Sequence, residues 1–173
     1  FQATGKWPAL IGVDYCIEGM GFPTAGEVRA AESNIAAKTY WAAGGLVTMT
    51  MHLQNPGVAD EAANHVRTEL TDAQFNELAM PGTPLHTKWM GPGYLAAIAD
   101  GLAELKQQGV VVILKPFHEP NIGAFWWGSN HPSALRLDAF KRAWRQLVGF
   151  LRVTWGLDNL LIGYAANAGG VHH

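Results

Sequence analysis

The stretch VVVILKPFHEPNIGAFWWG, residues 110–128, decides the fold. It opens with apolar and β-branched residues, turns polar at His118 and Glu119, and continues into a loop with three consecutive aromatic residues. An apolar run without alternation is typical of a parallel strand that is covered on both faces. The stretch therefore predicts a buried parallel strand with an imidazole and a carboxylate at its C-terminal end.

Three other runs share this character, and amphipathic segments lie between them. We expect strands at residues 9–15, 46–53, 110–117 and 160–167. We expect helices at residues 27–43, 72–79, 93–108 and 132–154, the second of them capped by Thr71. This alternation predicts an α/β fold of parallel βα repeats with right-handed crossovers, in a single domain over residues 1–173.

Composition and length exclude several classes of protein. The chain has 173 residues and a net charge of −2, which gives no sign of a nucleic-acid partner. No apolar run approaches the roughly 18 residues of a membrane span, and the single Cys16 excludes an intramolecular disulfide. A complete eight-stranded β/α barrel typically needs roughly 200 to 400 residues, so any barrel formed here is partial.

Polar residues stand at or directly after the C-terminal end of each expected strand. They are Asp14, His52, His118, Glu119 and Asn167. The C-terminal ends of parallel strands lie at one edge of the sheet, where α/β proteins build their sites. We therefore expect these five side chains to converge.

The aromatic loop after Glu119 indicates a sugar-binding site. Trp126 and Trp127 offer flat faces for sugar rings, and Asn121 and His118 offer hydrogen bonds to hydroxyl groups. Aromatic side chains also exclude water, which raises the pKa of a neighbouring carboxyl group and suits it to act as a general acid. Aromatic residues more often serve packing, and we expect at least one tryptophan to do so.

Other chemistries fit the sequence less well. His52, His118 and Glu119 offer metal-binding atoms, but the zinc spacing HExxH is absent. The sequence also has no GxSxG elbow, no P-loop and no GxGxxG after a strand. We therefore expect neither a metal ion nor a cofactor.

With these motifs placed, the sequence resembles glycoside hydrolase family 26, a family of retaining β/α-barrel enzymes best known as endo-β-1,4-mannanases. The resemblance lies in four stretches in the family's order, at residues 4–15, 44–56, 112–128 and 156–167. It implies that the chain corresponds to the second to fifth barrel strands, a half TIM barrel of about four strands with flanking helices.

The resemblance also implies functional roles. Glu119 would be the general acid/base of a hydrolase that acts on a β-linked plant polysaccharide, with β-mannan as the first choice. His52, His118 and one tryptophan of the loop would contact sugar in the central subsite. An extracellular protein is implied too, with a signal peptide that is not in this chain.

Three positions depart from the family pattern. Lys115 stands where the family has arginine, Met51 stands before the strand-two histidine in place of tryptophan, and Ala124 replaces an aromatic residue after the acid/base. The last change implies weaker stacking beside the cleaved bond. Mixed-linkage β-glucan, cellulose and xylan therefore remain alternative substrates.

The sequence does not identify the second catalytic carboxylate. A retaining glycosidase holds two carboxyl groups about 5 to 5.5 Å apart, and an inverting one roughly 6.5 to 9.5 Å apart. The family's nucleophile lies on the seventh strand, which has no counterpart here. Asp14 is the best-placed substitute, because it ends a strand at the same edge. The other candidates are Glu18, Asp60 and Glu61.

Two further readings follow from the missing strands. The chain is either a non-catalytic carbohydrate-binding half-barrel or an inactive fragment of a larger enzyme, if it is not itself a hydrolase. A half-barrel also leaves two sheet edges and its inner face uncovered. We therefore expect a homodimer or another self-association through these edges.

Overall fold

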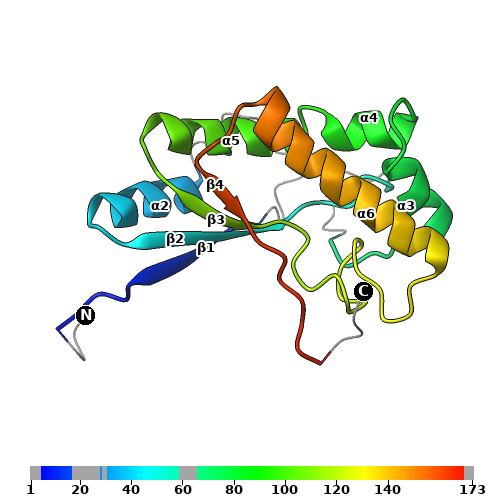
Figure 1. Ribbon diagram of the computed structural model, residues 1–173, viewed down its shortest axis with the longest axis horizontal. Helices are drawn as coiled ribbons and strands as arrows, with labels where there is room; N and C mark the ends of the chain where they lie inside the picture. Colours follow the sequence, from blue (N-terminus) through cyan, green and yellow to red (C-terminus); the bar gives the residue numbers. More distant parts are fainter. Residues whose placement is uncertain (1–4, 17–27, 29–30, 59–65, 170–173) are drawn as a thin grey trace.

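The structure, a computed structural model, describes residues 5–16, 28, 31–58 and 66–169 (Figure 1). Its sheet contains four strands in the order β1-β2-β3-β4. They are β1 Leu10–Cys16, β2 Leu46–His52, β3 Val112–Lys115 and β4 Leu160–Ile162. Each neighbouring pair is parallel, so all four C-terminal ends lie at one edge. The expected α/β fold, a partial barrel of parallel βα repeats, is confirmed.

The helices lie beside the strands in the expected order (Figure 1). They are α2 Glu32–Ala42, α3 Asp72–Leu78, α4 Pro84–Met90, α5 Leu95–Gln107 and α6 Ala134–Gly149, and the π-helix η1 Phe150–Thr154 extends α6. Part of the helix expected at residues 27–43 falls outside the described residues. The sequence interpretation missed α4, although Thr83 caps it and Pro84 occupies its first turn, both of which favour a helix start.

Two strands are shorter than expected. The strand expected at residues 110–117 ends at Lys115, because Pro116 has no amide hydrogen for the ladder and Phe117 has a φ of 40°. The strand expected at residues 160–167 ends at Ile162. Local apolar character extends beyond both ends, which is why it overstates the length of the ladder.

One face of the sheet packs against helices and the other is open. Val47, Met49 and Leu114 are at most 1 % exposed, and they alternate with residues on the opposite face. On that face Leu46 is 51 % exposed and Leu161 is 58 % exposed. For the part of the chain that the structure describes, the expectation from the apolar runs that both faces are covered is therefore wrong, whereas the uncovered inner face expected of a half-barrel is present.

Polar residues of the C-terminal edge project from the open face of the sheet. The register pairs Asp14 with Thr50 and Thr50 with Lys115, so these three side chains project from the same side of neighbouring strands. His52 lies two residues after Thr50 and shares that side.

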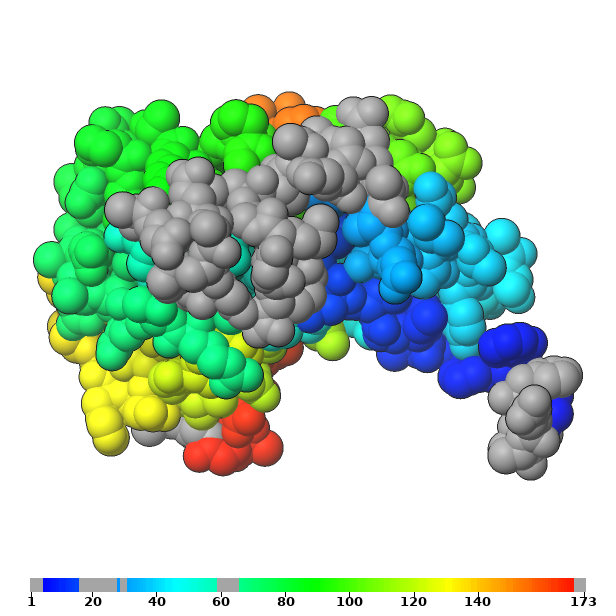
Figure 2. All heavy atoms as spheres, turned by 180° about the vertical axis from the view of Figure 1, so that it is seen from behind, coloured from blue at the N-terminus to red at the C-terminus, as the bar shows by residue number. Residues whose placement is uncertain are grey.

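Figure 2 shows the start of the described chain, residues 5–9, at one end of the molecule, far from the loop of residues 120–130.

Candidate active site

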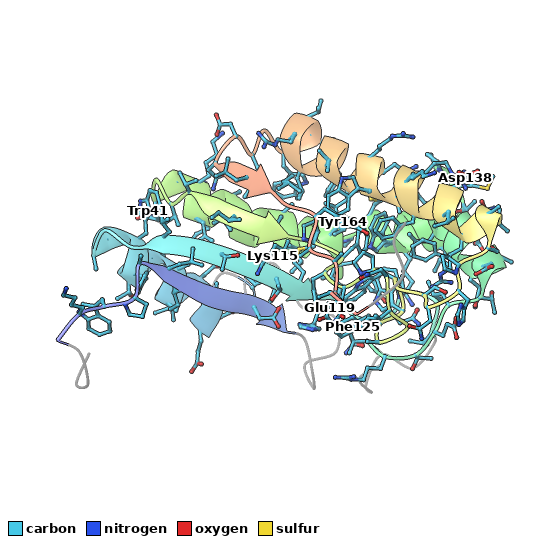
Figure 3. The ribbon with its side chains drawn as sticks, turned by 60° about the horizontal axis from the view of Figure 1, so that its bottom comes forward. Trp41, Lys115, Glu119, Phe125, Asp138 and Tyr164 are labelled. Atoms are coloured by element: carbon cyan, nitrogen blue, oxygen red, sulfur yellow. The ribbon has the colours of Figure 1, made fainter. Side chains whose placement is uncertain are left out.

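The C-terminal edge gathers the five predicted polar residues in two groups. The Nδ1 atom of His52 contacts the Oδ2 atom of Asp14, and the ring of His118 lies beside that of His52. In the second group, Asn167 donates from Nδ2 to Oε1 of Glu119 over 3.0 Å. Figure 3 shows Glu119, Lys115 and Phe125 near the ends of the strands. The edge therefore assembles two carboxylates, two imidazoles and an amide.

His118 and Glu119 lie on a tight turn and not on the strand itself. Phe117 and Glu119 have φ values of 40° and 51°, which side chains other than glycine rarely adopt. The amide of Glu119 donates to the carbonyl of Ala165 over 2.6 Å, which ties the turn to the segment after β4. Strained backbone of this kind clusters at functional sites, where surrounding contacts hold it.

The buried side chain of Asn121 holds the backbone of Asn167 through two hydrogen bonds. Its side chain donates to the Asn167 carbonyl and accepts from the Asn167 amide, both over 2.8 Å. Asn121 is 1 % exposed, so the described structure gives it a bracing position and not an accessible one. Asn167 is thereby held where its own amide meets Glu119.

The two histidines form a tight aromatic group with Phe125. The ring centroids of His52 and His118 are 4.4 Å apart, and Phe125 lies 5.0 Å and 4.7 Å from them. Burial and, to a smaller extent, the neighbouring His52 together lower the pKa of His118 from 6.5 to about 4. The His118 ring is therefore neutral near pH 7, and its buried Nδ1 has no hydrogen-bond partner among the residues that the structure describes.

Both tryptophans of the loop are buried. Trp126 is 0 % exposed and donates from Nε1 to the Leu53 carbonyl, while Trp127 is 2 % exposed and donates to the His118 carbonyl. The sequence interpretation expected at least one to serve packing, and the structure places both in the core. Trp127 stacks on Phe125 at 4.7 Å between centroids, so it supports the ring that lies against the histidines.

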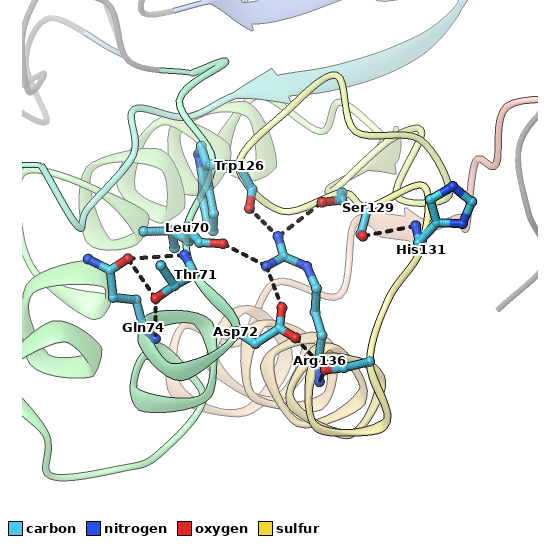
Figure 4. Close-up of polar contacts among 10 residues, drawn as sticks. Leu70, Thr71, Asp72, Gln74, Trp126, Ser129, His131 and Arg136 are labelled. Carbon is cyan, nitrogen blue, oxygen red and sulfur yellow. Dashed lines mark hydrogen bonds and ion pairs between the residues drawn. The ribbon is translucent and has the colours of Figure 1, made fainter.

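A buried arginine fixes the loop from the side of α6 (Figure 4). Arg136 donates to the carbonyls of Leu70, Trp126 and Gly128 over 2.7 to 3.0 Å, and it pairs with Asp72 at 3.3 Å. It is 2 % exposed. Charge-assisted bonds to three carbonyls in a dry environment hold the loop to the start of α3.

Gly128 allows the loop to close. A Cβ atom at this position would lie 2.1 Å from the Ile122 carbonyl oxygen, which is far inside contact distance. The glycine that ends the motif therefore permits the close approach of two backbone segments.

The sequence interpretation did not include Phe125, Arg136 or Arg67 among the site residues. Phe125 was visible as part of the aromatic run, but nothing local showed that it meets both histidines. Arg136 lies within an ordinary amphipathic helix. The guanidinium of the exposed Arg67 stands 5.7 Å from the Phe125 centroid, at the rim of the group. These positions depend on contacts between distant segments.

The remaining carboxylate candidates are only partly described. Asp14 is engaged with His52, whereas Glu18, Asp60 and Glu61 lie outside the described residues. Within the described ranges, no three His, Cys, Asp or Glu side chains gather as a metal ion would require. A search of the same residues finds no helix with the length and apolarity needed to cross a membrane.

A parallel βα sheet with carboxylates and imidazoles at its C-terminal edge is the arrangement of part of a β/α barrel. The family model described as Glycosyl hydrolase family 26 matches residues 1–171, and the chain belongs to this family. A mannan endo-1,4-beta-mannosidase from Bacillus subtilis is 33% identical over 173 residues, covering 96% of this chain and 46% of that protein.

Solved structures agree with this assignment. The YdhT protein from Bacillus subtilis has a TM-score of 0.82 at 30% identity, over 98% of this chain and 51% of that one. A beta-mannanase from a symbiotic protist of the termite Reticulitermes speratus, complexed with gluco-manno-oligosaccharide, has a TM-score of 0.70 at 27% identity, over 93% and 48%. The chain spans about half the length of the curated relatives it matches.

Proposed function

We propose that the chain carries the acid/base half of a β-mannan hydrolase site, with Glu119 as the general acid/base. The observation that supports this most is the fixed position of the Glu119 side chain and backbone. Asn167 donates to its carboxylate over 3.0 Å, and the backbone of Glu119 is tied to Ala165. A general acid must be held within hydrogen-bond reach of the bond that it protonates.

His52 and His118 are the proposed sugar contacts. They lie at the same edge, half-buried beside Phe125, and a neutral imidazole has one donor and one acceptor for hydroxyl groups. The names of the relatives point to β-mannan among the β-linked polysaccharides. Secretion is proposed with the substrate, because a polysaccharide of this kind lies outside the cell.

Turnover and binding are tested together on the full chain. Release of reducing sugar from β-1,4-mannan, mixed-linkage β-glucan and xylan is measured for the parent, Glu119→Gln and the exposed control Glu69→Gln. General acid/base catalysis contributes about 10²- to 10⁴-fold, so Glu119→Gln is expected to lose at least about 100-fold while the control keeps parent activity. Equal activity of Glu119→Gln and parent contradicts the acid/base role.

Binding without turnover is the alternative outcome. The family's nucleophile has no counterpart among the four strands, and Asp14 as the second carboxylate stays a prediction. If the parent binds β-1,4-mannotetraose but releases no sugar, the chain is a carbohydrate-binding half-barrel. If it does neither, the chain by itself has no function on mannan.

We also propose that two copies associate through the open sheet. Leu10, Leu46 and Leu161 are 44 %, 51 % and 58 % exposed, and the register places all three on the open face. Strands β1 and β4 are the edges of the sheet, and unpaired edges favour pairing with another chain. A second copy offers both the apolar face and the complementary edge.

Sedimentation analysis tests this association. The parent is expected to sediment as a dimer at micromolar concentration, and Leu161→Asp is expected to shift it toward monomer. Val153→Asp is the matched control, because Val153 is 84 % exposed in η1, outside the sheet. A parent that stays monomeric and soluble at high concentration refutes the proposal.

A further inference from the structure

The structure pairs Asp14 with His52 across neighbouring strands. Asp14 on β1 pairs with Thr50 on β2, and His52 lies two residues after Thr50 on the same face of the sheet. The Oδ2 atom of Asp14 contacts Nδ1 of His52. The two side chains are 32 % and 24 % exposed, so the contact is partly shielded from water. Both residues belong to strands, whose backbone is more rigid than that of a loop.

This contact selects one form of the His52 ring. An ionised carboxylate only accepts hydrogen bonds, so the hydrogen must lie on Nδ1 of His52. A neutral imidazole then has no hydrogen on Nε2, which becomes an acceptor. The other carboxylate oxygen, Oδ1 of Asp14, is buried without a partner, so the group has no competing donor within the described contacts.

The ring is also held in orientation. The rings of His118 and Phe125 lie against it in T-shaped arrangements with interplanar angles of 73° and 64°, and the Trp127 ring centroid is 6.4 Å away. His118 adds no competing positive charge near pH 7, because its pKa is lowered to about 4. Both the orientation and the hydrogen position of His52 are therefore set before any ligand arrives.

We propose that Asp14 is a positioning residue that acts through His52, fixing its tautomer so that Nε2 accepts a hydrogen bond from a sugar hydroxyl. The inference rests on the proposed function for its ligand. It differs from the role of second catalytic carboxylate, because an amide can replace the carboxylate as a hydrogen-bond acceptor but cannot act as a nucleophile or a base.

The test compares Asp14→Ala with Asp14→Asn, beside the exposed control Asp138→Ala on α6. Nitrogen and proton chemical shifts of the His52 ring are recorded on the full chain at pH 8, above the ordinary imidazole pKa, and assigned with His52→Gln. Affinity for β-1,4-mannotetraose is measured by calorimetry, turnover is measured as release of reducing sugar from β-1,4-mannan, and circular dichroism checks folding.

The expected result has three parts. The parent and Asp138→Ala show the hydrogen on Nδ1, and Asp14→Ala shows a mixture of both tautomers with an affinity lower by about tenfold, the loss of about one hydrogen bond. Asp14→Asn keeps the hydrogen on Nδ1 and the parent affinity where the amide oxygen faces the ring, and it moves the hydrogen to Nε2 with the same loss of affinity as Asp14→Ala where the amide NH2 faces the ring.

Other outcomes overturn the inference at distinct points. A parent with the hydrogen on Nε2, or an Asp14→Ala variant with an unchanged tautomer, refutes the positioning by Asp14 whether or not sugar binds. An Asp14→Asn variant that keeps the tautomer but loses turnover as fully as Asp14→Ala assigns the carboxylate to catalysis instead. If the parent binds no mannotetraose, the proposed function and the sugar contact fail, while the tautomer still decides the pairing.

Discussion

Arg136→Ala is expected to lower the free energy of unfolding by about 3–5 kcal/mol, because it removes a buried cation from a set of fixed partners. Arg136 is 2 % exposed and bonds three backbone carbonyls. Each carbonyl left without a partner in a dry environment costs about 1–3 kcal/mol. The guanidinium also stands 4.8 Å from the Phe75 centroid, which adds packing loss to the same change.

Urea unfolding followed by tryptophan fluorescence measures this loss. For a slope of about 2 kcal/mol per molar urea, a loss of about 4 kcal/mol moves the midpoint by about 2 M. Arg145→Ala is the matched control, since Arg145 is exposed on the same helix and is expected to change stability by less than about 0.5 kcal/mol.

A small effect would refute the reasoning. If Arg136→Ala costs less than about 1 kcal/mol, the carbonyls do not depend on the guanidinium and the loop is held by packing alone. If Arg136→Ala does not fold, Arg136→Lys decides the matter. Its single ammonium keeps the charge but cannot reproduce the planar fork, so a measurable loss is expected for it as well.

Three further predictions concern the loop, the histidine pair and a helix start. Gly128→Ala is expected to lower the free energy of unfolding by about 1–3 kcal/mol, because its Cβ would lie 2.1 Å from a carbonyl oxygen of the same loop. In the same urea assay Gly149→Ala is expected to be neutral or stabilising, because no atom lies within 4 Å of the added Cβ. Because the pKa of His118 is lowered from 6.5 to about 4, the unfolded chain takes up the proton first. Stability is therefore expected to fall as pH drops from 6.5 toward 4, and thermal unfolding of His118→Gln should show a weaker fall. Thr71→Ala removes the capping box of α3 and is expected to cost about 1 kcal/mol in urea unfolding; an unchanged midpoint would contradict the cap.

The sequence by itself determined the order of elements and the edge at which the site lies. Apolar runs at residues 46–53 and 110–117 have a length and composition that favour parallel strands, and polar residues stand at or directly after their C-terminal ends. Thr71 likewise marks the start of α3 through a contact with a residue three positions away. These features are local, so composition and spacing are enough to predict them.

Only the tertiary structure decided which side chains meet. Arg136 bonds Leu70 from 66 residues away, and Asn121 braces Asn167 from 46 residues away. The burial of both tryptophans and the pairing of Asp14 with His52 depend in the same way on how separated segments pack. The pattern of apolar and polar residues in a segment indicates which of its side chains are buried. It does not indicate which distant residues those side chains contact, because packing and hydrogen bonding between segments decide those contacts.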